Sequence, residues 1–451
     1  MGNDTEEELF TRKQLVALVL PLIVEQLLTI TVGIADTMMV SVAGEAAVSG
    51  ASLVDAVNVL ILMVLSALAT GGAVVCSQAL GRKDTEEACE AADQLLLVTV
   101  GFALAVLAVM LIGGRSLLHL IFGATEEDVM DQAVTYFHIV IFSYPFMAVY
   151  NSAAALFRSM GNSRVSMKVS LLMNGINVAG NAILIFGFHM GVAGAAWATL
   201  IARIIGSAVL FGMALQPRYE IHIDNLAGIR PRLAVIQKIL YIGIPTGLEN
   251  GLFQLGKLLV LSLVSSLGTA SIMANSVASN LTQFMNIPGM AMSLAVVTVA
   301  GQCIGAGRPD EARRYTNMMV AAATVMIESV SVVVLLLRPI LLDLYNMSEA
   351  SRTIASTLLV WHTFATLIWP IAFNLSNALR AGNDVKFTLV VSMMSMWIFR
   401  VGFSYLLGGY FGLGVYGVWI AMFLDWAVRA AFFLVRYRGD KWYQKAIPAA
   451  K

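Results

Sequence analysis

The chain has 451 residues, of which 59% are hydrophobic and 12% charged, and its mean hydropathy is +0.80. Charged residues make up about a quarter of an ordinary soluble chain, so this composition excludes a water-soluble enzyme and predicts a surface that faces lipid. The 28 basic and 28 acidic residues give a net charge of zero, which argues against a nucleic-acid partner. Three cysteines, at positions 76, 89 and 303, are too few and too scattered for a disulfide framework or a metal cluster.

Twelve apolar runs follow one another along the chain. Each approaches or exceeds the ~20 residues that a helix needs to cross about 30 Å of hydrocarbon. Their limits are near 14–40, 46–79, 93–113, 131–156, 165–187, 190–215, 239–265, 269–304, 315–337, 353–378, 387–409 and 412–436. The acidic start MGNDTEEELFTRK lacks the basic region and cleavage site of a signal peptide. The sequence therefore predicts an all-α integral membrane protein with twelve transmembrane helices.

Lysine and arginine residues are distributed unevenly between the two sides of the predicted membrane. The segments on the side of the N-terminus hold 21 of them, whereas the opposite loops hold three: Arg115, Arg338 and Arg352. Basic residues are retained on the cytoplasmic side. We therefore expect a multi-pass protein with both termini in the cytoplasm.

The second half of the chain repeats the first. At a fixed offset of 224, Pro21 and Glu25 match Pro245 and Glu249, and the match continues through later helices with a small drift. We expect a cytoplasmic N-terminal segment at 1–13, an N-lobe at 14–215, a cytoplasmic linker at 216–238, a C-lobe at 239–436 and a cytoplasmic tail at 437–451. Six crossings in each lobe predict two pseudo-symmetric lobes with a shared cavity near the membrane midplane.

Polar side chains within the apolar runs are candidates for function, since a charge at the membrane centre is costly. Asp36 lies in the outer half of the first run, where a helix end that reaches outer water is the simpler interpretation. In the fifth run Asn177 and Asn181 share one helix face, either as contacts between helices or as oxygen ligands for a cation. Thr199 in the sixth run completes this set, and Asn151 in the fourth is a weaker member.

Two glutamates at matching positions of the repeat are further candidates. Glu249 lies near mid-depth in the seventh run, and Lys257 follows it by two turns on the same face. A structural ion pair between these two is one interpretation, and an acid facing the cavity is the other. Glu25 is the equivalent acid of the first run and is a second candidate for the cavity.

No motif of nucleotide-binding or hydrolytic enzymes, such as GxGxxG, the P-loop, HExxH or GxSxG, occurs in a credible context. The five histidines are dispersed, which argues against an intramembrane enzyme. The sequence therefore predicts no enzyme and no cofactor, and any transport must draw on an energy source other than ATP hydrolysis within this chain.

Several stretches together resemble the prokaryotic branch of the multidrug and toxic-compound extrusion (MATE) family. They are the first run from Pro21 to GIADTMMV, the loops QALGRKD and QCIGAGRPDEA, the FRSMGNS stretch, and GVAGAAWAT. The resemblance covers nearly the whole chain. It implies twelve helices in two six-helix lobes, a location in the plasma (inner) membrane, and antiport that exports bulky cationic or amphipathic drugs in exchange for Na⁺ or H⁺.

The resemblance also implies roles for individual residues. Asp36 matches the central coupling acid of the family, and Asn177, Asn181 and Thr199 match its polar partners. These four residues are therefore candidate ligands for Na⁺. Some members carry Asp at the position of Asn181, which leaves this chain one acid short. Glu249 comes only one turn after Pro245, and the tenth run has no acid, so the C-lobe ion site of another branch carries over poorly.

A flippase or exporter of lipid-linked oligosaccharide or polysaccharide, from the related superfamily, is the alternative function. It is expected to line its cavity with several basic residues for pyrophosphate, whereas most basic residues here lie in cytoplasmic loops. As partners we expect small-molecule drugs or toxic organic cations and membrane lipid, with the chain acting as a monomer. Glu249 and Glu25 are the acids expected to favour cationic substrates.

Overall fold

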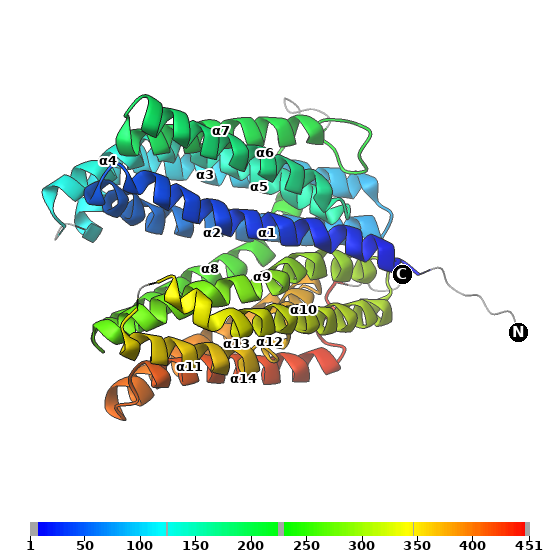
Figure 1. Cartoon of the computed structure of the whole chain (residues 1–451). Helices are drawn as coiled ribbons and strands as arrows, with labels where there is room; N and C mark the ends of the chain where they lie inside the picture. Colours follow the sequence, from blue (N-terminus) through cyan, green and yellow to red (C-terminus); the bar gives the residue numbers. More distant parts are fainter. Residues whose placement is uncertain (1–7, 123–124, 224–229, 346, 447–451) are drawn as a thin grey trace, which may run out of the picture. The chain divides into compact units, whose positions relative to one another are not determined.

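The computed structural model describes residues 8–122, 125–223, 230–345 and 347–446, and every regular element within them is helical. The remaining parts of the predicted terminal segments and linker lie outside the described residues. In chain order the elements are α1 (Arg12–Ser41), α2 (Glu45–Gly81), α3 (Thr85–Phe122), α4 (Glu127–Val140), η1 (Ile141–Ser143), α5 (Tyr144–Ser159), α6 (Ser163–Asn181), η2 (Ala182–Gly187), α7 (Gly191–Ala214), α8 (Leu233–Ser265), α9 (Thr269–Gly305), α10 (Pro309–Asp343), α11 (Glu349–Ala365), α12 (Trp369–Ala381), α13 (Val385–Met394), η4 (Ser395–Gly402), η5 (Ser404–Tyr410) and α14 (Gly414–Arg438) (Figure 1).

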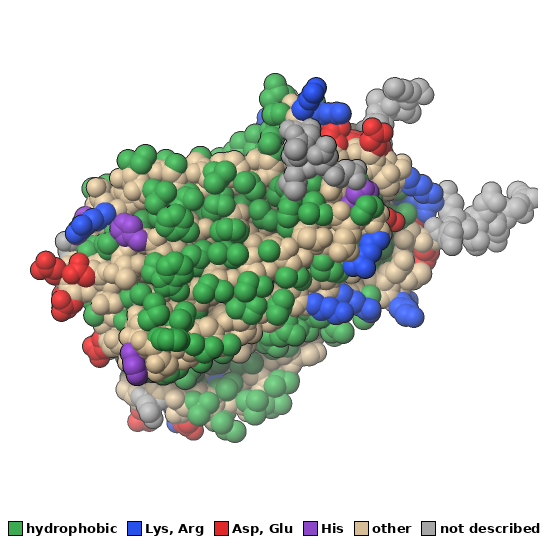
Figure 2. All heavy atoms as spheres, turned by 90° about the horizontal axis from the view of Figure 1, so that it is seen from above, with side chains coloured by type: hydrophobic (Ala, Val, Ile, Leu, Met, Phe, Trp, Pro, Cys, Tyr) green, Lys and Arg blue, Asp and Glu red, His purple; other side chains and the backbone are tan. Residues whose placement is uncertain are grey.

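The twelve predicted crossings each correspond to one long helical segment of the described chain. Ten segments are long and apolar enough to span a membrane, and the bent pair α11 and α12 makes an eleventh. The 33-residue α8 is the twelfth. On the face in Figure 2, apolar side chains cover the middle and charged ones gather toward the two ends. The prediction of a twelve-helix membrane protein is thus confirmed.

Some helices extend further than their apolar runs. The third run was expected at 93–113, whereas α3 begins at Thr85 and ends at Phe122. The ninth, expected at 315–337, belongs to α10, which has Asp310 and Glu311 in its first turn. Acidic residues are favourable at a helix N-terminus, so the helix continues past the apolar part into the polar boundary of the membrane.

Irregular helix geometry recurs at matching places in the two halves of the chain. The fourth span is broken by η1, two residues before Pro145, and the tenth bends by 50° between α11 and α12, just before Pro370. The fifth and eleventh spans both contain π-helical turns, in η2 and in η4 with η5. Gly44 and Gly268, 224 positions apart, both precede a helix with positive φ, which glycine adopts without strain. The structure therefore shows the repeat that the sequence predicts.

The chain divides into two compact units by its contacts. One contains residues 12–247, here called the N-half, and the other contains residues 248–446 with residues 8–11, here called the C-half. The unit boundary lies inside α8, after Gly247, rather than in the polar linker expected at 216–238. The first part of α8 packs closely on α2, where a Cβ on Gly71 would overlap the backbone of Ile239. The contacts of this part of α8 thus assign it to the N-half. The polarity of the sequence does not predict such contacts between helices.

Each half is built around one buried helix. In the N-half α2 packs against α3, α4 and α5, and in the C-half α9 packs against α10, α11 and α12. Helix α9 is the most extensively buried span of its half, and α2 shares that place in the N-half with the span Glu127–Ser159. Close packing needs small residues, and a side chain at Gly72 would overlap Leu95 of α3. The halves therefore share one packing plan.

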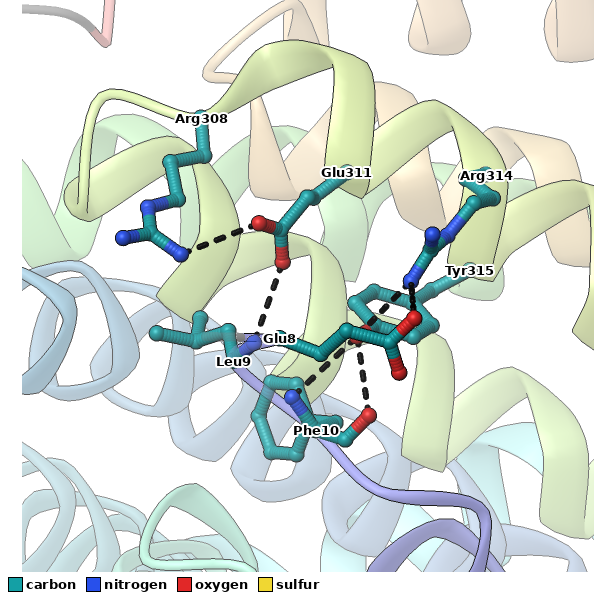
Figure 3. Close-up of polar contacts among 7 residues, drawn as sticks. All are labelled: Glu8, Leu9, Phe10, Arg308, Glu311, Arg314 and Tyr315. Carbon is teal, nitrogen blue, oxygen red and sulfur yellow. Dashed lines mark hydrogen bonds and ion pairs between the residues drawn. The ribbon is translucent and has the colours of Figure 1, made fainter. Parts of the chain in front are cut away.

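A glutamate at the start of a helix binds a chain segment in each half. In the N-half Glu87 forms an ion pair with Lys238 of α8 at 2.9 Å. In the C-half Glu311, 224 positions later, accepts a hydrogen bond from the Leu9 amide at 3.2 Å (Figure 3). Residues 8–10 are held further by Arg314 and by Tyr315, whose hydroxyl contacts the amide and carbonyl groups of Phe10. We call this set of contacts the N-terminal clasp.

Candidate functional site

Asp36 lies in the last two turns of α1 and contacts the predicted polar residues of α6. Asn181 is buried and donates a hydrogen bond from Nδ2 to Asp36 Oδ1 at 2.6 Å. The other end of this amide, Asn181 Oδ1, is buried without a hydrogen-bond partner among the described residues. The amide that binds the Asp36 carboxylate therefore also carries an oxygen with no hydrogen-bond partner among the described residues.

Asn177 lies one turn before Asn181 and joins Asp36 to α7. In the amide orientation that satisfies both neighbours, its nitrogen donates to Asp36 Oδ1 at 2.7 Å, and its oxygen accepts from the Thr199 hydroxyl at 3.2 Å. The spacing of four residues, which sets both amides on one face of α6, explains why both reach the same carboxylate. The structure thus brings Asp36, Asn177, Asn181 and Thr199 together, as the sequence predicts.

A second acid, Asp55 of α2, lies within electrostatic range of Asp36, as does the guanidinium of Arg203 in α7. Asp55 accepts a hydrogen bond from Asn58 at 3.1 Å, and Arg203 donates to the hydroxyl of Ser143 at 2.7 Å. Neither of these charged residues belongs to the site that the sequence predicts. No local sequence pattern relates them to Asp36, although each is a charge within an apolar run.

The remaining predicted members of the N-half site lie apart from this network in their contacts. Asn151 of α5 makes no side-chain hydrogen bond to a described residue. Glu25 is buried in α1 and accepts a hydrogen bond from Ser166 at 3.2 Å. Glu25 also interacts electrostatically with Arg158 of α5, so an arginine compensates its charge.

Glu249 pairs with a residue other than Lys257. Its carboxylate accepts a hydrogen bond from Arg380 of α12 at 2.7 Å, and both side chains are about nine-tenths buried. The interpretation of a Glu249–Lys257 pair is therefore wrong. Two residues eight positions apart on a helix are separated by about 12 Å along its axis, whereas Arg380 approaches from a neighbouring helix. A substrate-binding role for Glu249 and Glu25 stays a prediction.

The interior of the C-half contains a second charged cluster. Asp425 of α14 is fully buried and binds Arg429 of the same helix at 2.7 Å and the hydroxyl of Ser395. Arg400 of η4 lies 3.8 Å from the other oxygen of Asp425. His362 is buried among the rings of Trp419 and Trp426 and takes no part in this cluster. The two halves thus differ in the charge that they bury.

The polar set around Asp36 has the chemistry of a site for a small cation. Among the described residues no group of three or more His, Cys, Asp or Glu side chains could hold a metal ion. What α1, α6 and α7 offer instead are carboxylate, amide and hydroxyl oxygens, which hard cations prefer. A carboxylate in such a setting can equally bind a proton.

A protein-family model for MatE matches the chain twice, over residues 21–183 and 245–406. The two matches begin 224 residues apart, which is the offset of the internal repeat. Together they cover well over half of the chain. The family is one of transporters and not of enzymes.

Relatives and solved structures agree with this match over nearly the full length. The chain is 29% identical to "Uncharacterized transporter YisQ" of Bacillus subtilis, covering 96% of this chain and 95% of that protein. It is 25% identical to "Probable multidrug resistance protein NorM" of Thermotoga maritima, covering 97% and 94%. A crystal structure of MATE in the bent conformation has the same fold, with a TM-score of 0.88 at 20% identity, covering 96% and 97%. The chain belongs to the MatE family and is a multi-pass multidrug and toxic-compound extrusion transporter.

Proposed function

We propose that this transporter exports amphipathic compounds in exchange for a cation, Na⁺ or H⁺, that binds at Asp36. The observation that carries the proposal is the unpartnered, buried oxygen of Asn181 beside the Asp36 carboxylate. A buried acceptor without a partner is costly, and a cation held between the two oxygens removes this cost. Asn177 and Thr199 supply the neutral partners that orient the carboxylate.

Coupling follows from the position of Asp36 on α1, whose contacts with α6 include the side chains that hold the ion. Loading the site neutralises Asp36 and changes the packing of α1 against α6. If this packing favours substrate release, binding of the ion weakens binding of the substrate. Binding of the substrate then weakens binding of the ion by the same free energy. The ion enters from outside and the compound leaves in the opposite direction.

Orientation is part of this proposal. Both termini lie in the cytoplasm of the cell, supported by the excess of 21 basic residues over three between the two sides. Positive groups on the substrates are favoured by the acids Asp36 and Asp55 of the N-half, which share one nearby arginine, Arg203.

Efflux of ethidium from energised vesicles tests the proposal. Asp36→Asn keeps the size of the side chain and removes its charge, so we expect export driven by the ion gradient to be lost. The matched control is Asp343→Asn, the same substitution at an exposed ion pair with Arg352, which should export normally. Full gradient-driven efflux by Asp36→Asn would contradict the proposal.

The coupling ion is identified by a second measurement on the unmodified protein. Replacing Na⁺ by K⁺ at fixed pH abolishes efflux if Na⁺ is the coupling ion and leaves it unchanged if H⁺ is. Thr199→Val, which removes one oxygen and retains Asp36, should weaken the ion dependence without abolishing it.

A further inference from the structure

The membrane-spanning helices of the C-half carry more basic than acidic side chains away from their ends, although the side chain of Lys257 is exposed and that of Arg400 is only partly buried. Two ion pairs are balanced, between Arg380 and Glu249 and between Arg429 and Asp425. Two cations are left over: Lys257 in α8 and Arg400 in η4. Glu328, the third acid in the middle of these helices, accepts a hydrogen bond from Thr366 and forms no ion pair with a described residue.

Arg400 is incompletely compensated by its one nearby carboxylate. Its Nη1 lies 3.8 Å from Asp425 Oδ2, while Asp425 Oδ1 already accepts hydrogen bonds from Arg429 and Ser395. The Nε of Arg400 is buried and has no hydrogen-bond partner among the described residues. A guanidinium N–H group is therefore available to a ligand at this place.

Lys257 lies near the same aromatic ring as Arg400 and Arg429, that of Phe253. Its Nζ lies 5.8 Å from the ring centroid, and the guanidinium carbons of Arg400 and Arg429 each lie 5.3 Å from it. Lys257 forms no ion pair with any described residue. It lies eight residues, or about 12 Å, from the outer end of α8. Three cations thus surround one aromatic ring, which attracts them but does not neutralise them.

Close packing between helices creates this arrangement. Residue 256 of α8 is glycine, and a Cβ there would overlap the side chains of Met396 and Val401. The absence of a side chain lets α8 approach η4, and Lys257, the next residue, interacts electrostatically with Arg400. Lys257 has no carboxylate partner among the described residues and Arg400 has only a distant one. A charge without a partner in a membrane-spanning segment is costly, and a bound anion relieves this.

We propose that the C-half contains a binding site for the anionic group of an amphipathic substrate, a carboxylate, sulfonate or phosphate carried on an aromatic body. Lys257 and the free Nε of Arg400 bind the anionic group, and Phe253 packs against the aromatic body. Arg429 is positioned by Asp425 and adds to the positive electrostatic potential at the site. This inference rests on the proposed transport function, because it names a chemical class of compound that the transporter binds.

An anionic lipid headgroup presents the same chemistry as a soluble organic anion. The two sources are separated by the lipid in which the protein is held. In nanodiscs of phosphatidylcholine, which has no net charge, a soluble anion binds without competition. If added phosphatidylglycerol displaces the anion from the site, the site serves lipid and the inference is overturned.

The test uses two dyes that share the three-ring xanthene body and differ in charge: fluorescein, an anion, and rhodamine 123, a cation. Their binding to the full chain in phosphatidylcholine nanodiscs is measured by fluorescence polarisation. We expect Lys257→Met to raise the Kd of fluorescein about tenfold or more, since one charge-assisted hydrogen bond is lost. Rhodamine 123 should bind as tightly as before or more tightly.

Two further variants keep the result interpretable. Lys238→Met is the matched control, the same substitution in the same helix at a lysine that pairs with Glu87, and it should leave fluorescein binding unchanged. Lys257→Arg should restore it. Equal fluorescein binding by wild type and Lys257→Met, or binding of rhodamine 123 alone by wild type, would overturn the inference. Because binding requires no ion gradient, these results are independent of ethidium export by Asp36→Asn.

Discussion

The two halves share their framework and differ in the charges that they bury. Both repeats of the chain have a proline in their first helix, at Pro21 and Pro245, and a glutamate one turn later. Each glutamate interacts with the arginine at the matching position of the repeat, Glu25 with Arg158 and Glu249 with Arg380. These interactions belong to the shared architecture, and features confined to one half are the better candidates for function.

The site around Asp36 is confined to the N-half. At an offset of 224 the C-half has Val260 in place of Asp36, and counting from the shared tryptophans 197 and 419 it has Ala421 in place of Thr199. The same count aligns Arg203 with Asp425, a reversal of charge. Duplication followed by divergence thus left the proposed cation site in one half and more basic than acidic side chains in the other. A fold comparison alone would treat the halves as equivalent.

Removal of the one carboxylate in the C-half cluster should have the largest effect on stability. Asp425→Asn leaves Arg429 and Arg400 buried near a neutral amide, and loss of one partner of a buried ion pair costs about 3–5 kcal/mol. Chemical unfolding of the purified protein in detergent measures the loss. Asp343→Asn, at an exposed pair, should cost no more than about 1 kcal/mol. Equal losses for the two variants would contradict the assignment of the cluster.

The paired glutamates should respond alike if they are structural. Glu249→Gln retains a hydrogen-bond acceptor for Arg380 but removes the charge, so we expect a loss of about 3 kcal/mol in the free energy of unfolding. Glu25→Gln should act in the same direction in the N-half. The Kd of rhodamine 123 for each folded variant distinguishes a structural role from a substrate-binding role. Loss of a structural acid leaves this Kd unchanged, whereas loss of a substrate-binding acid raises it.

The smallest effect is expected at the N-terminal clasp. Tyr315→Phe removes the hydroxyl that contacts the amide and carbonyl of Phe10 but keeps the edge-to-face contact between the rings. Each lost hydrogen bond contributes about 0.5–1.5 kcal/mol. Hydrogen exchange at the amide of Phe10 should become faster, whereas exchange within α9 should not change. An unchanged rate at Phe10 would show that these bonds do not hold the segment.

Much of this structure follows from local pattern. Twelve apolar runs and the repeat predict twelve helices, and the four-residue spacing of Asn177 and Asn181 predicts that they face one partner. The contact of Asp36 with α6 required the family resemblance, because no local pattern relates residues 145 positions apart. Arg380 as the partner of Glu249, and the boundary within α8, depend on packing between helices and were not predicted. The charge excess of the C-half became visible only when its ion pairs could be matched.

The central claim is that the coupling ion binds in the N-half at Asp36 and opposes substrate binding. The most direct test is the equilibrium Kd of ethidium for purified protein, measured with and without a saturating concentration of the coupling ion. The account predicts that the ion raises this Kd in wild type by about 5-fold to 150-fold, the usual range of coupling between sites, and has no effect on it in Asp36→Asn. An undiminished shift in Asp36→Asn would contradict the account and place the coupling ion elsewhere.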